Sequence, residues 1–449
     1  MLFLDPTVAS HMTGDARLSV CPPSEMRVAF KRDRPYENFI SLYCSYLYDD
    51  ECGEYRIYYI ARDKSDRSMM ALASSKDGLN FTKPNLGVLE YDGSKENNLM
   101  NIPGGDGNVF IDRNAPHTER YKYLTHFYGS GLFLYVSEDG IHWSDKRTLI
   151  APLMLDGCNM ALYDDTEKCY RYYIRGWELT KNKMARIALW GECDKLTPFE
   201  LKEPLPYRNV KNEQPYADTK HFNYALSCDE HDLPSADLYT LPVSCYPDSE
   251  RYFIAFPSLY RHGDAQTGLE NDGFVESGFA ASRDGKVWER FDRTPYIRNE
   301  IAGENQNSMS YFGTGVHLIG DMIYSCGIRY STRHGEVKRR REEGDGVVVL
   351  YGQRRDGYVC ADFGRGGSVE VKSRRLGDVL RLNVDTGAVG WLKLVCECGS
   401  ERFEAEICGN SLSHEVKLPE GFIGKSARLS FEGANARLFA IETDEMKLL

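Results

Sequence analysis

The stretch Ser137-Glu138-Asp139-Gly140-Ile141-His142-Trp143 belongs to a pattern, Ser-x-Asp-Gly-x-x-aromatic, that occurs three times in the chain. The other copies are Ser75–Phe81 and Ser282–Trp288. An apolar, strand-like run precedes the Ser of each copy, and Asp-Gly favours a tight turn with a residue at positive φ. The pattern therefore predicts repeated β-hairpins, and we assign its Asp residues to turns rather than to chemistry.

The segments around these hairpins repeat as well. Each repeat has an acidic turn followed by a Tyr-rich strand, and successive repeats are spaced by roughly 50–80 residues, a period typical of repeat folds. The strands are expected at Tyr55–Ile60, Tyr121–Leu124, Tyr170–Arg175, Arg251–Phe256 and, more weakly, His317–Ser325. No sustained helical periodicity separates them. The sequence therefore predicts an all-β protein with a five-bladed β-propeller.

The pattern changes near Arg354–Tyr358. The segments that follow are shorter alternating strands with Gly-rich turns and no propeller-type repeat. We expect an N-terminal arm at 1–25, the propeller at 26–353 and a β-sandwich at 354–449. The sandwich domain leaves open a homo-oligomer.

The amino-acid composition limits the kinds of molecule that the protein is expected to bind. The net charge of −12 argues against nucleic acid and anionic membranes, and no apolar run reaches the length of a membrane span. The basic run Lys338–Arg341 is followed at once by two Glu, so we interpret it as a solvated loop. Aromatic residues make up 12% of the chain, which fits a carbohydrate binder because sugar rings stack on aromatic faces.

The cysteines and the N-terminal sequence bear on location. The 13 Cys are scattered without regular spacing, and Met1–Pro6 lacks the basic and long apolar regions of a signal peptide. A cytoplasmic location is the expectation. The ten His form no H-x-x-x-H or H-E-x-x-H pattern, and there is no P-loop or G-x-S-x-G motif. We therefore expect no cofactor and no metal ligands, although a structural cation in the funnel is left open.

Each repeat carries a carboxylate shortly before its Tyr-rich strand, where a propeller presents side chains to its central funnel. Glycoside cleavage needs one carboxyl group that donates a proton and a second that attacks or activates water. The catalytic candidates are Asp156, Asp237, Glu37 and Glu304. An acidic residue at a strand end can equally cap a turn, so each candidate competes with a structural role.

Other polar and aromatic residues near the same strands are candidates for holding a substrate. A buried Arg needs a carboxylate or an anionic ligand, so an internal ion pair is the alternative for the arginines. Aromatic rings could stack on sugars or belong to the core. The substrate-binding candidates are Asp106, Asn159, Arg175, Trp177, Tyr239, Tyr260, Arg261, His262 and Arg329.

Three segments carry a resemblance to known proteins: Asp33–Glu37, Phe81–Asn98 and Arg354–Tyr358. They resemble uncharacterised bacterial proteins described as glycosyl hydrolase-like, over nearly the whole chain. Those proteins are similar in turn to the five-bladed propeller superfamily of glycoside hydrolase families 32, 43, 68 and 130. The resemblance implies a sugar-binding funnel with carboxylates. The fructosidase motifs W-M-N-D-P-N-G and R-D-P are absent, so residue roles do not transfer one by one.

Three functions follow from these observations. The leading hypothesis is a glycoside hydrolase that acts on a small oligosaccharide or glycoside, with Asp156 and either Glu37 or Asp237 as the working pair. The second is a glycoside phosphorylase in which Arg175, Arg261, His262 or Arg329 binds phosphate. The third is a non-catalytic carbohydrate-binding propeller.

Overall fold

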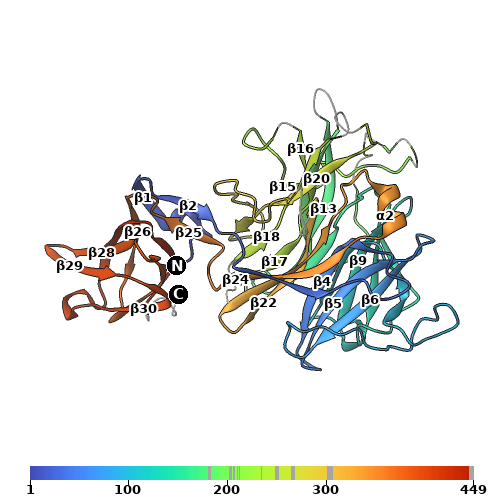
Figure 1. The fold of residues 1–449 in the computed structure, drawn as a ribbon, viewed down its shortest axis with the longest axis horizontal. Helices are drawn as coiled ribbons and strands as arrows, with labels where there is room; N and C mark the ends of the chain where they lie inside the picture. Colours follow the sequence, from blue (N-terminus) through green and yellow to red (C-terminus); the bar gives the residue numbers. More distant parts are fainter. Residues whose placement is uncertain are drawn as a thin grey trace. The chain divides into compact units, whose positions relative to one another are not determined.

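The computed structural model describes residues 1–443 apart from 180–183, 202–204, 206–207, 210, 212, 234, 248–251, 264–267 and 301–306. Its regular structure is nearly all β, as the sequence predicts. The chain divides into unit 1 (Met1–Pro23, Glu289–Thr294 and Gln353–Leu449) and unit 2 (Ser24–Trp288 and Pro295–Gly352) (Figure 1). In the described part of the chain, no helix has the length and apolar character needed to cross a membrane.

The strands of unit 2 form antiparallel meanders, which we name A to E in the order in which β4, β8, β12, β16 and β22 follow one another along the chain. Meander A contains β4 (Phe39–Asp49), β5 (Glu54–Arg62), β6 (Ser68–Ser75) and β7 (Leu99–Pro103). Meander B contains β8 (Asp106–Ile111), β9 (Tyr121–Phe127), β10 (Gly131–Ser137) and β11 (Thr148–Ala151). Meander C contains β12 (Met160–Asp164), β13 (Cys169–Leu179), β14 (Met184–Cys193) and β15 (Asn223–Leu226).

The last two meanders are less regular. Meander D has its strands split into the segments β16 (Ala236–Thr240), β17 (Val243–Cys245), β18 (Phe253–Ala255), β19 (Ser258–His262), β20 (Gly273–Ser277) and β21 (Ala280–Ser282). Meander E contains β22 (Met309–Ile319), β23 (Met322–Tyr330), β24 (Val347–Arg354) and the N-terminal strand β3 (Glu25–Phe30). Strand β3 pairs with β24, so the start of unit 2 completes its last sheet.

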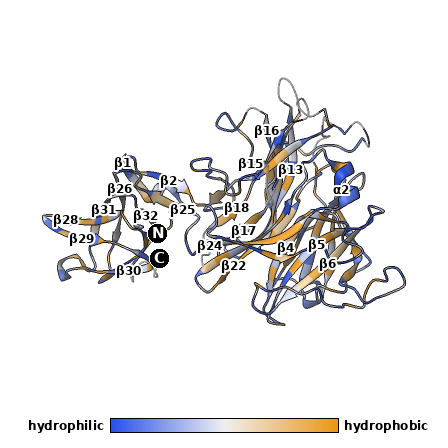
Figure 2. Ribbon diagram, viewed as in Figure 1, coloured by the Kyte–Doolittle hydropathy of each residue, from blue (hydrophilic) through white to orange (hydrophobic). Residues whose placement is uncertain are grey.

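The Tyr-rich strands are buried on both faces. In β5, Ile57 and Tyr59 pack in one core cluster with Tyr311 and Leu350 of meander E, whereas Tyr58 packs with Tyr121 of meander B. Alternate side chains of a strand point to opposite faces, so β5 contributes to two cores at once. Figure 2 shows the hydrophobic residues that β4, β5 and β6 supply for this purpose.

The innermost strands of the meanders are joined in a closed ring by side-chain contacts. One cavity of ≈ 430 Å³ is lined by β4, β8, β12, β17 and β22, one strand from each meander. The contacts around it are Val109 N to Ser45 Oγ (2.9 Å), Ala161 N to Asn108 Oδ1 (3.0 Å), Val243 N to Met160 Sδ (3.0 Å), Gly315 N to Ser244 Oγ (2.8 Å) and Thr314 Oγ1 to Ser45 Oγ (3.3 Å). The meanders therefore surround a common axis.

The Ser-x-Asp-Gly copies form tight turns in the structure. Asp139 Oδ1 accepts hydrogen bonds from the backbone N–H groups of Ile141 and His142, both at 2.8 Å, and Gly140 has φ +73°. The other copies make the same bonds. Two of the turns also contact the second strand of the preceding meander: Arg56 Nη1 donates to the Asp139 carbonyl (2.6 Å), and Tyr173 Oη donates to the Gly285 carbonyl (2.7 Å).

Unit 1 contains two five-stranded antiparallel sheets. The first has the order β1 (Ala9–Gly14), β26 (Gly367–Arg375), β31 (Ser426–Ala434), β28 (Trp391–Cys398), β29 (Glu401–Ile407). The second has the order β2 (Arg17–Val20), β25 (Val359–Asp362), β32 (Arg437–Thr443), β27 (Val379–Asp385), β30 (Asn410–Lys417). Unit 1 also has short 3-10 turns at η1 (Pro6–Val8) and η3 (Glu420–Phe422), and unit 2 has one at η2 (His117–Glu119).

Two expectations from the sequence need correction. The predicted arm at 1–25 is not separate, because β1 and β2 are edge strands that pair with β26 and β25 of unit 1. The basic run Lys338–Arg341 is not a loop but lies in the short helix α2 (Val337–Glu343), whose exposed residues form salt bridges between Arg or Lys and Glu side chains one turn apart.

The ring around the axis predicts a specific loss of stability. Asn108 is 3% exposed and contacts both the N–H and the C=O of Ala161. Asn108→Ala leaves these backbone groups unpaired, so we expect the free energy of unfolding to fall by about 2–4 kcal/mol. Asn101 makes the same two contacts with the backbone of Trp143 but is exposed, so Asn101→Ala should cost less than about 1 kcal/mol. Urea unfolding of both variants tests this, and equal losses would contradict the proposed importance of the ring.

Candidate functional site

Three of the predicted carboxylates gather near the innermost strands of meanders B, C and D. Asp106 begins β8, Asp156 precedes β12, and Asp237 lies in β16. Arg175 of β13 pairs with Asp156, and Arg186 of the neighbouring strand β14 pairs with Asp237. We call the set Asp106, Asp156, Asp237, Arg175 and Arg186 the carboxylate cluster.

The two ion pairs of the cluster meet at one aromatic ring. Arg175 Nη1 lies 3.2 Å from Asp156 Oδ2, and Arg186 Nη1 lies 2.8 Å from Asp237 Oδ2. The guanidinium carbons lie 4.4 Å and 5.4 Å from the centre of the Tyr239 ring. Cation–π attraction to this ring helps to hold two like-charged guanidinium groups near each other.

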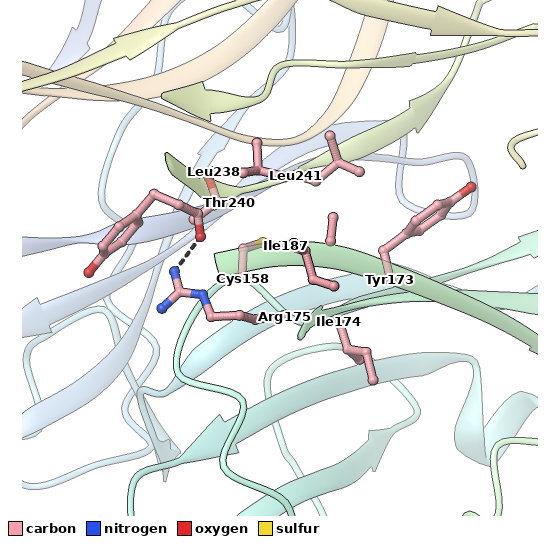
Figure 3. A pocket seen from close by; sticks show the side chains of 10 residues that line it. Cys158, Tyr173, Ile174, Arg175, Ile187, Leu238, Thr240 and Leu241 are labelled. Carbon is pink, nitrogen blue, oxygen red and sulfur yellow. Dashed lines mark hydrogen bonds between the residues drawn. The ribbon is translucent and has the colours of Figure 1, made fainter. Parts of the chain in front are cut away.

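Arg175 is a positioning residue rather than a free cation. Its side chain is 2% exposed, and it also donates a hydrogen bond to the carbonyl of Tyr239. Figure 3 shows Arg175 among the residues that line a small pocket, with this hydrogen bond as a dashed line. A Cβ on Gly157 would lie 2.6 Å from the guanidinium carbon, so glycine is required for this close approach. The neighbouring Asp156 has φ +37°, a strained conformation for a residue other than glycine. The side chain of Asp156 nevertheless remains 39% exposed.

Asn159 fixes the loop between Asp156 and β12. Its Nδ2 donates to the carbonyls of Gly157 (2.6 Å) and Asp106 (3.3 Å), and its Oδ1 accepts from the N–H of Arg175 (3.2 Å). The side chain is fully buried. Asn159 therefore holds Asp106 and Asp156 in register, which corrects its predicted role as a substrate ligand.

Asp106 is the carboxyl group whose environment favours its protonated form. Burial raises the pKa of Asp106 and is the largest effect; the contact with His126 lowers it, the charge of Asp156 raises it, and the net shift is upward. His126 Nε2 accepts a hydrogen bond from the N–H of Leu155 (3.4 Å), so the neutral ring carries its proton on Nδ1, 4.0 Å from Asp106 Oδ2. The Asp106 side chain remains 21% exposed.

Asp237 has the opposite preference. Burial would raise the pKa of this carboxyl group, but the contact with His262 and the charge of Arg186 outweigh burial and lower it. His262 Nε2 lies 3.3 Å from Asp237 Oδ2. The side chain of Asp237 is 5% exposed. Neighbouring carboxyl groups with pKa values displaced in opposite directions are typical of acid/base sites.

The structure assigns Glu37 to the scaffold, in contrast to its predicted catalytic role. Its fully buried carboxylate accepts from Lys83 Nζ (2.7 Å), Tyr59 Oη (2.5 Å) and the N–H groups of Asp33 and Arg34. Both oxygens are occupied, so the carboxylate is not open to a substrate. The fourth catalytic candidate, Glu304, lies outside the described residues.

The predicted aromatic platforms have different surroundings. Tyr260 is fully buried and donates to the carbonyl of Asn271 (2.7 Å), and Tyr239 is 8% exposed beneath the two arginines, so neither presents a face to a sugar. Trp177 is half-buried, with its ring 5.0 Å from that of Tyr216. Trp177 is therefore the stacking candidate that remains.

Two predicted arginines pair elsewhere. Arg261 Nη1 lies 3.3 Å from Glu276 Oε2, and Arg329 Nη2 lies 3.5 Å from Glu300 Oε2. Their ion pairs involve none of the cluster carboxylates, so the structure gives these arginines the internal pairing that was the alternative to substrate binding.

Several site residues were missed by the sequence analysis. Arg186 interrupts the apolar alternation of β14 and pairs in register with Trp177, and His126 lies at the end of a Tyr-rich strand. A charged or imidazole side chain within a buried strand was the signal available for both. Nothing in the sequence singles out His334, whose Nε2 accepts from Tyr239 Oη at 3.1 Å.

Some of the buried polar atoms that lack a hydrogen-bond partner lie at this site, and others lie elsewhere in the described part of the chain. Those at the site are His126 Nδ1, Arg175 Nε, Trp177 Nε1, Arg186 Nε, Asp237 Oδ1 and His262 Nε2. A buried polar atom without a partner calls for an explanation, and a bound polar molecule is one. In the described part of the chain, no group of three or more His, Cys, Asp and Glu side chains is arranged to hold a metal ion.

Comparisons with known proteins gave structural matches only. No protein-family model matches the chain. No curated protein sequence matches it. Similar solved structures include an N-acetylgalactosamine deacetylase from F. plautii, with 13% identity over 75% of this chain and 94% of that chain and a TM-score of 0.44.

Two glycoside hydrolases are among the other matches. The Bombyx mori GH32 β-fructofuranosidase BmSUC1 has 9% identity over 93% of this chain and 94% of that chain, with a TM-score of 0.41. The catalytic domain of the Coprinopsis cinerea GH62 α-L-arabinofuranosidase has 10% identity over 75% and 97%, with a TM-score of 0.42. Similarities at this level identify neither a substrate nor a reaction.

The opposite pKa shifts of Asp106 and Asp237 predict opposite effects on stability. The folded protein retains the Asp106 proton to a higher pH than the unfolded chain, whose Asp pKa is 3.8. Ionisation of Asp106 therefore costs stability, and this cost grows as the pH rises through the raised pKa. We expect Asp106→Asn to raise the Tm at pH 7, with a gain that vanishes towards pH 4.

Asp237→Asn is the matched control. The lowered pKa of Asp237 means that its carboxylate stabilises the fold above pH 3.8 and loses this effect as the pH falls through the folded-state value. Asp237→Asn should therefore lower the Tm at pH 7, because Arg186 loses its carboxylate partner. Circular-dichroism melts of both variants from pH 4 to pH 8 measure the two effects. A Tm that falls in both variants at pH 7 would refute the assignment of Asp106.

Proposed function

We propose that unit 2 is a five-bladed β-propeller, that unit 1 is a β-sandwich, and that the carboxylate cluster cleaves a glycosidic bond by acid/base chemistry. The substrate would be a small oligosaccharide or glycoside. The observation that carries this proposal is the pairing of Asp106, a carboxyl group whose pKa is raised mainly by burial, with the partly exposed Asp156, whose charge acts on it. Two carboxyl groups in different environments are what glycoside hydrolysis requires.

The roles follow from the surroundings of each group. Asp106 protonates the leaving oxygen, because its pKa is raised and part of its side chain is exposed. Asp156 acts as the base or nucleophile, and Arg175 fixes its orientation. Asp237 stays ionised, and its free Oδ1 accepts a hydrogen bond from a substrate hydroxyl.

The unpartnered polar atoms support a hydroxyl-rich ligand. His126 Nδ1 and Trp177 Nε1 are donors, whereas Asp237 Oδ1 is an acceptor. A sugar hydroxyl both donates and accepts, so a single saccharide can satisfy this mixed set. The half-buried ring of Trp177, with the guanidinium carbon of Arg186 5.3 Å from its centre, would add apolar contact to a pyranose or furanose ring.

Phosphorolysis has less support at the cluster itself. Arg175 is paired with Asp156, Arg261 with Glu276 and Arg329 with Glu300, and His262 lies against Asp237. Each group expected to hold a phosphate at the reaction centre therefore already contacts a carboxylate. Hydrolysis needs no such anion site.

Replacement of Asp156 and Asp106 tests the proposal. In a panel of aryl glycosides and small oligosaccharides, we expect Asp156→Asn and Asp106→Asn each to lower kcat by about 10²–10⁴-fold, the usual contribution of a general acid or base. Arg261→Gln, outside the cluster, should keep activity within about threefold while breaking a comparable ion pair.

The outcomes separate the three functions. Product formation that requires added phosphate would indicate a phosphorylase. Saccharide binding without turnover across the panel would indicate a binding protein. Unchanged activity in Asp156→Asn would remove this residue from the reaction.

A further inference from the structure

A cavity of ≈ 140 Å³ in unit 2 is lined mainly by charged side chains from the end of β5, the loop after it and helix α2. We call it the basic pocket. Its lining residues are Asn38, Phe39, Arg62, Asp63, Lys64, Asp66, Val337, Arg340 and Arg341. Four of them are cationic and two are anionic, in a protein whose net charge is −12. Figure 2 shows α2 as a hydrophilic segment beside the hydrophobic strands.

The acidic residues do not neutralise the pocket. Asp63 Oδ1 accepts from the N–H groups of Ser65 (2.8 Å) and Arg67 (3.0 Å), and its other oxygen lies 3.4 Å from the Arg67 side chain. Asp63 is therefore occupied by its own turn. Asp66 lies between Arg62 (3.4 Å) and Arg341 (3.3 Å) and can offset only one of these two charges.

Among the described residues, two cations of the basic pocket have no ion pair. Arg340 donates to Thr332 Oγ1 (3.1 Å) and to the carbonyls of Arg333 (2.7 Å) and His334 (3.2 Å), and none of these partners is charged. Lys64 is exposed at the rim. In addition, Arg62 Nε is buried without a hydrogen-bond partner. The pocket therefore keeps an excess of positive charge and at least one donor for an anion.

Direct contacts connect the basic pocket to the carboxylate cluster. Arg340 donates to the carbonyl of His334, the His334 ring accepts from Tyr239 Oη (3.1 Å), and Arg175 donates to the carbonyl of Tyr239. The charge of Arg62, another residue that lines the pocket, also acts on the carboxyl group of Asp106. The basic pocket is thus linked to the carboxylate cluster by this charge and by the contacts through Tyr239.

We propose that the basic pocket binds an anionic group of the substrate, so that the substrate is an acidic saccharide carrying a carboxylate, sulfate or phosphate. This inference rests on the function proposed above and adds its substrate class. Guanidinium and ammonium groups around a concave site are the usual way in which proteins hold oxyanions. Free inorganic phosphate has the same chemistry and is the alternative occupant.

Matched substrate pairs test the inference. Aryl glycosides are assayed as neutral sugars and as the corresponding uronic acids and 6-sulfates. We expect kcat/KM to be at least about tenfold higher for the acidic member of the pair that is cleaved best. The double variant Lys64→Gln/Arg341→Gln should reduce this ratio about tenfold through KM, while the rate with the neutral member stays unchanged.

The control removes the same number of positive charges, both of them from α2. Lys338→Gln/Arg339→Gln lies on α2 outside the basic pocket, where Arg339 pairs with Glu336 and Glu343, so the ratio should stay within about twofold. Equal turnover of acidic and neutral members by the unmodified protein would overturn the inference. So would a Lys64→Gln/Arg341→Gln variant in which both rates fall together.

A binding measurement separates this inference from the proposed function. If no glycoside is cleaved, the proposed function fails, and calorimetry with trigalacturonate, a neutral trisaccharide and inorganic phosphate still tests the pocket. Binding of trigalacturonate that is lost in Lys64→Gln/Arg341→Gln but kept in the control supports the anionic subsite. Absence of binding, or binding that all variants share, overturns it. Phosphate-dependent formation of a glycosyl phosphate would identify free phosphate as the occupant and overturn the acidic substrate.

Discussion

The ring of contacts among the innermost strands is the constraint on which the site depends. These strands run side by side around an axis without a regular hydrogen-bond ladder between them, so their inward backbone groups need other partners. Ser45, Asn108 and Ser244 supply these partners from small side chains that fit where the strands converge. Asp106 lies in the ring strand β8, and Asp237 lies in β16, directly before the ring strand β17. The ring therefore also fixes the backbone positions of these two carboxylates.

Local sequence patterns made the turns and several site residues predictable. The features that could not be predicted depend on pairing between residues far apart in the chain. The Ser-x-Asp-Gly turns use backbone hydrogen bonds within a few residues, so the sequence contains all of their partners. Asp156 and Asp237 could be proposed because charge near a strand end is visible in the sequence, and Arg175 because it is a charged residue within a strand expected to be buried. The hydrogen bonds that occupy Glu37 depend on Lys83, 46 positions further along the chain. The pairing of β1 with β26 depends on residues that are more than 350 positions apart. Neither has a local signature.

The site retains features that oppose stability. A carboxyl group with a raised pKa, a non-glycine residue at φ +37° and several unpartnered polar atoms lie within one cluster. Each costs free energy in the folded protein, on the order of 1–3 kcal/mol. The buried tyrosines and the inter-meander turns offset these costs elsewhere in unit 2. Strain concentrated where polar groups converge is typical of a place that binds and transforms a ligand.

The placement of β1, β2 and β3 has a consequence for biosynthesis. Each of these strands is synthesised well before the strand with which it pairs: Ser10 contacts Glu370, 360 positions later, and β3 pairs with β24. On the ribosome, the earliest segments must therefore stay unpaired while almost the whole of unit 2 emerges. A nascent chain that stops before β24 therefore lacks the partner of β3 and cannot complete meander E, and one that stops before β25 and β26 leaves β1 and β2 without their partner strands.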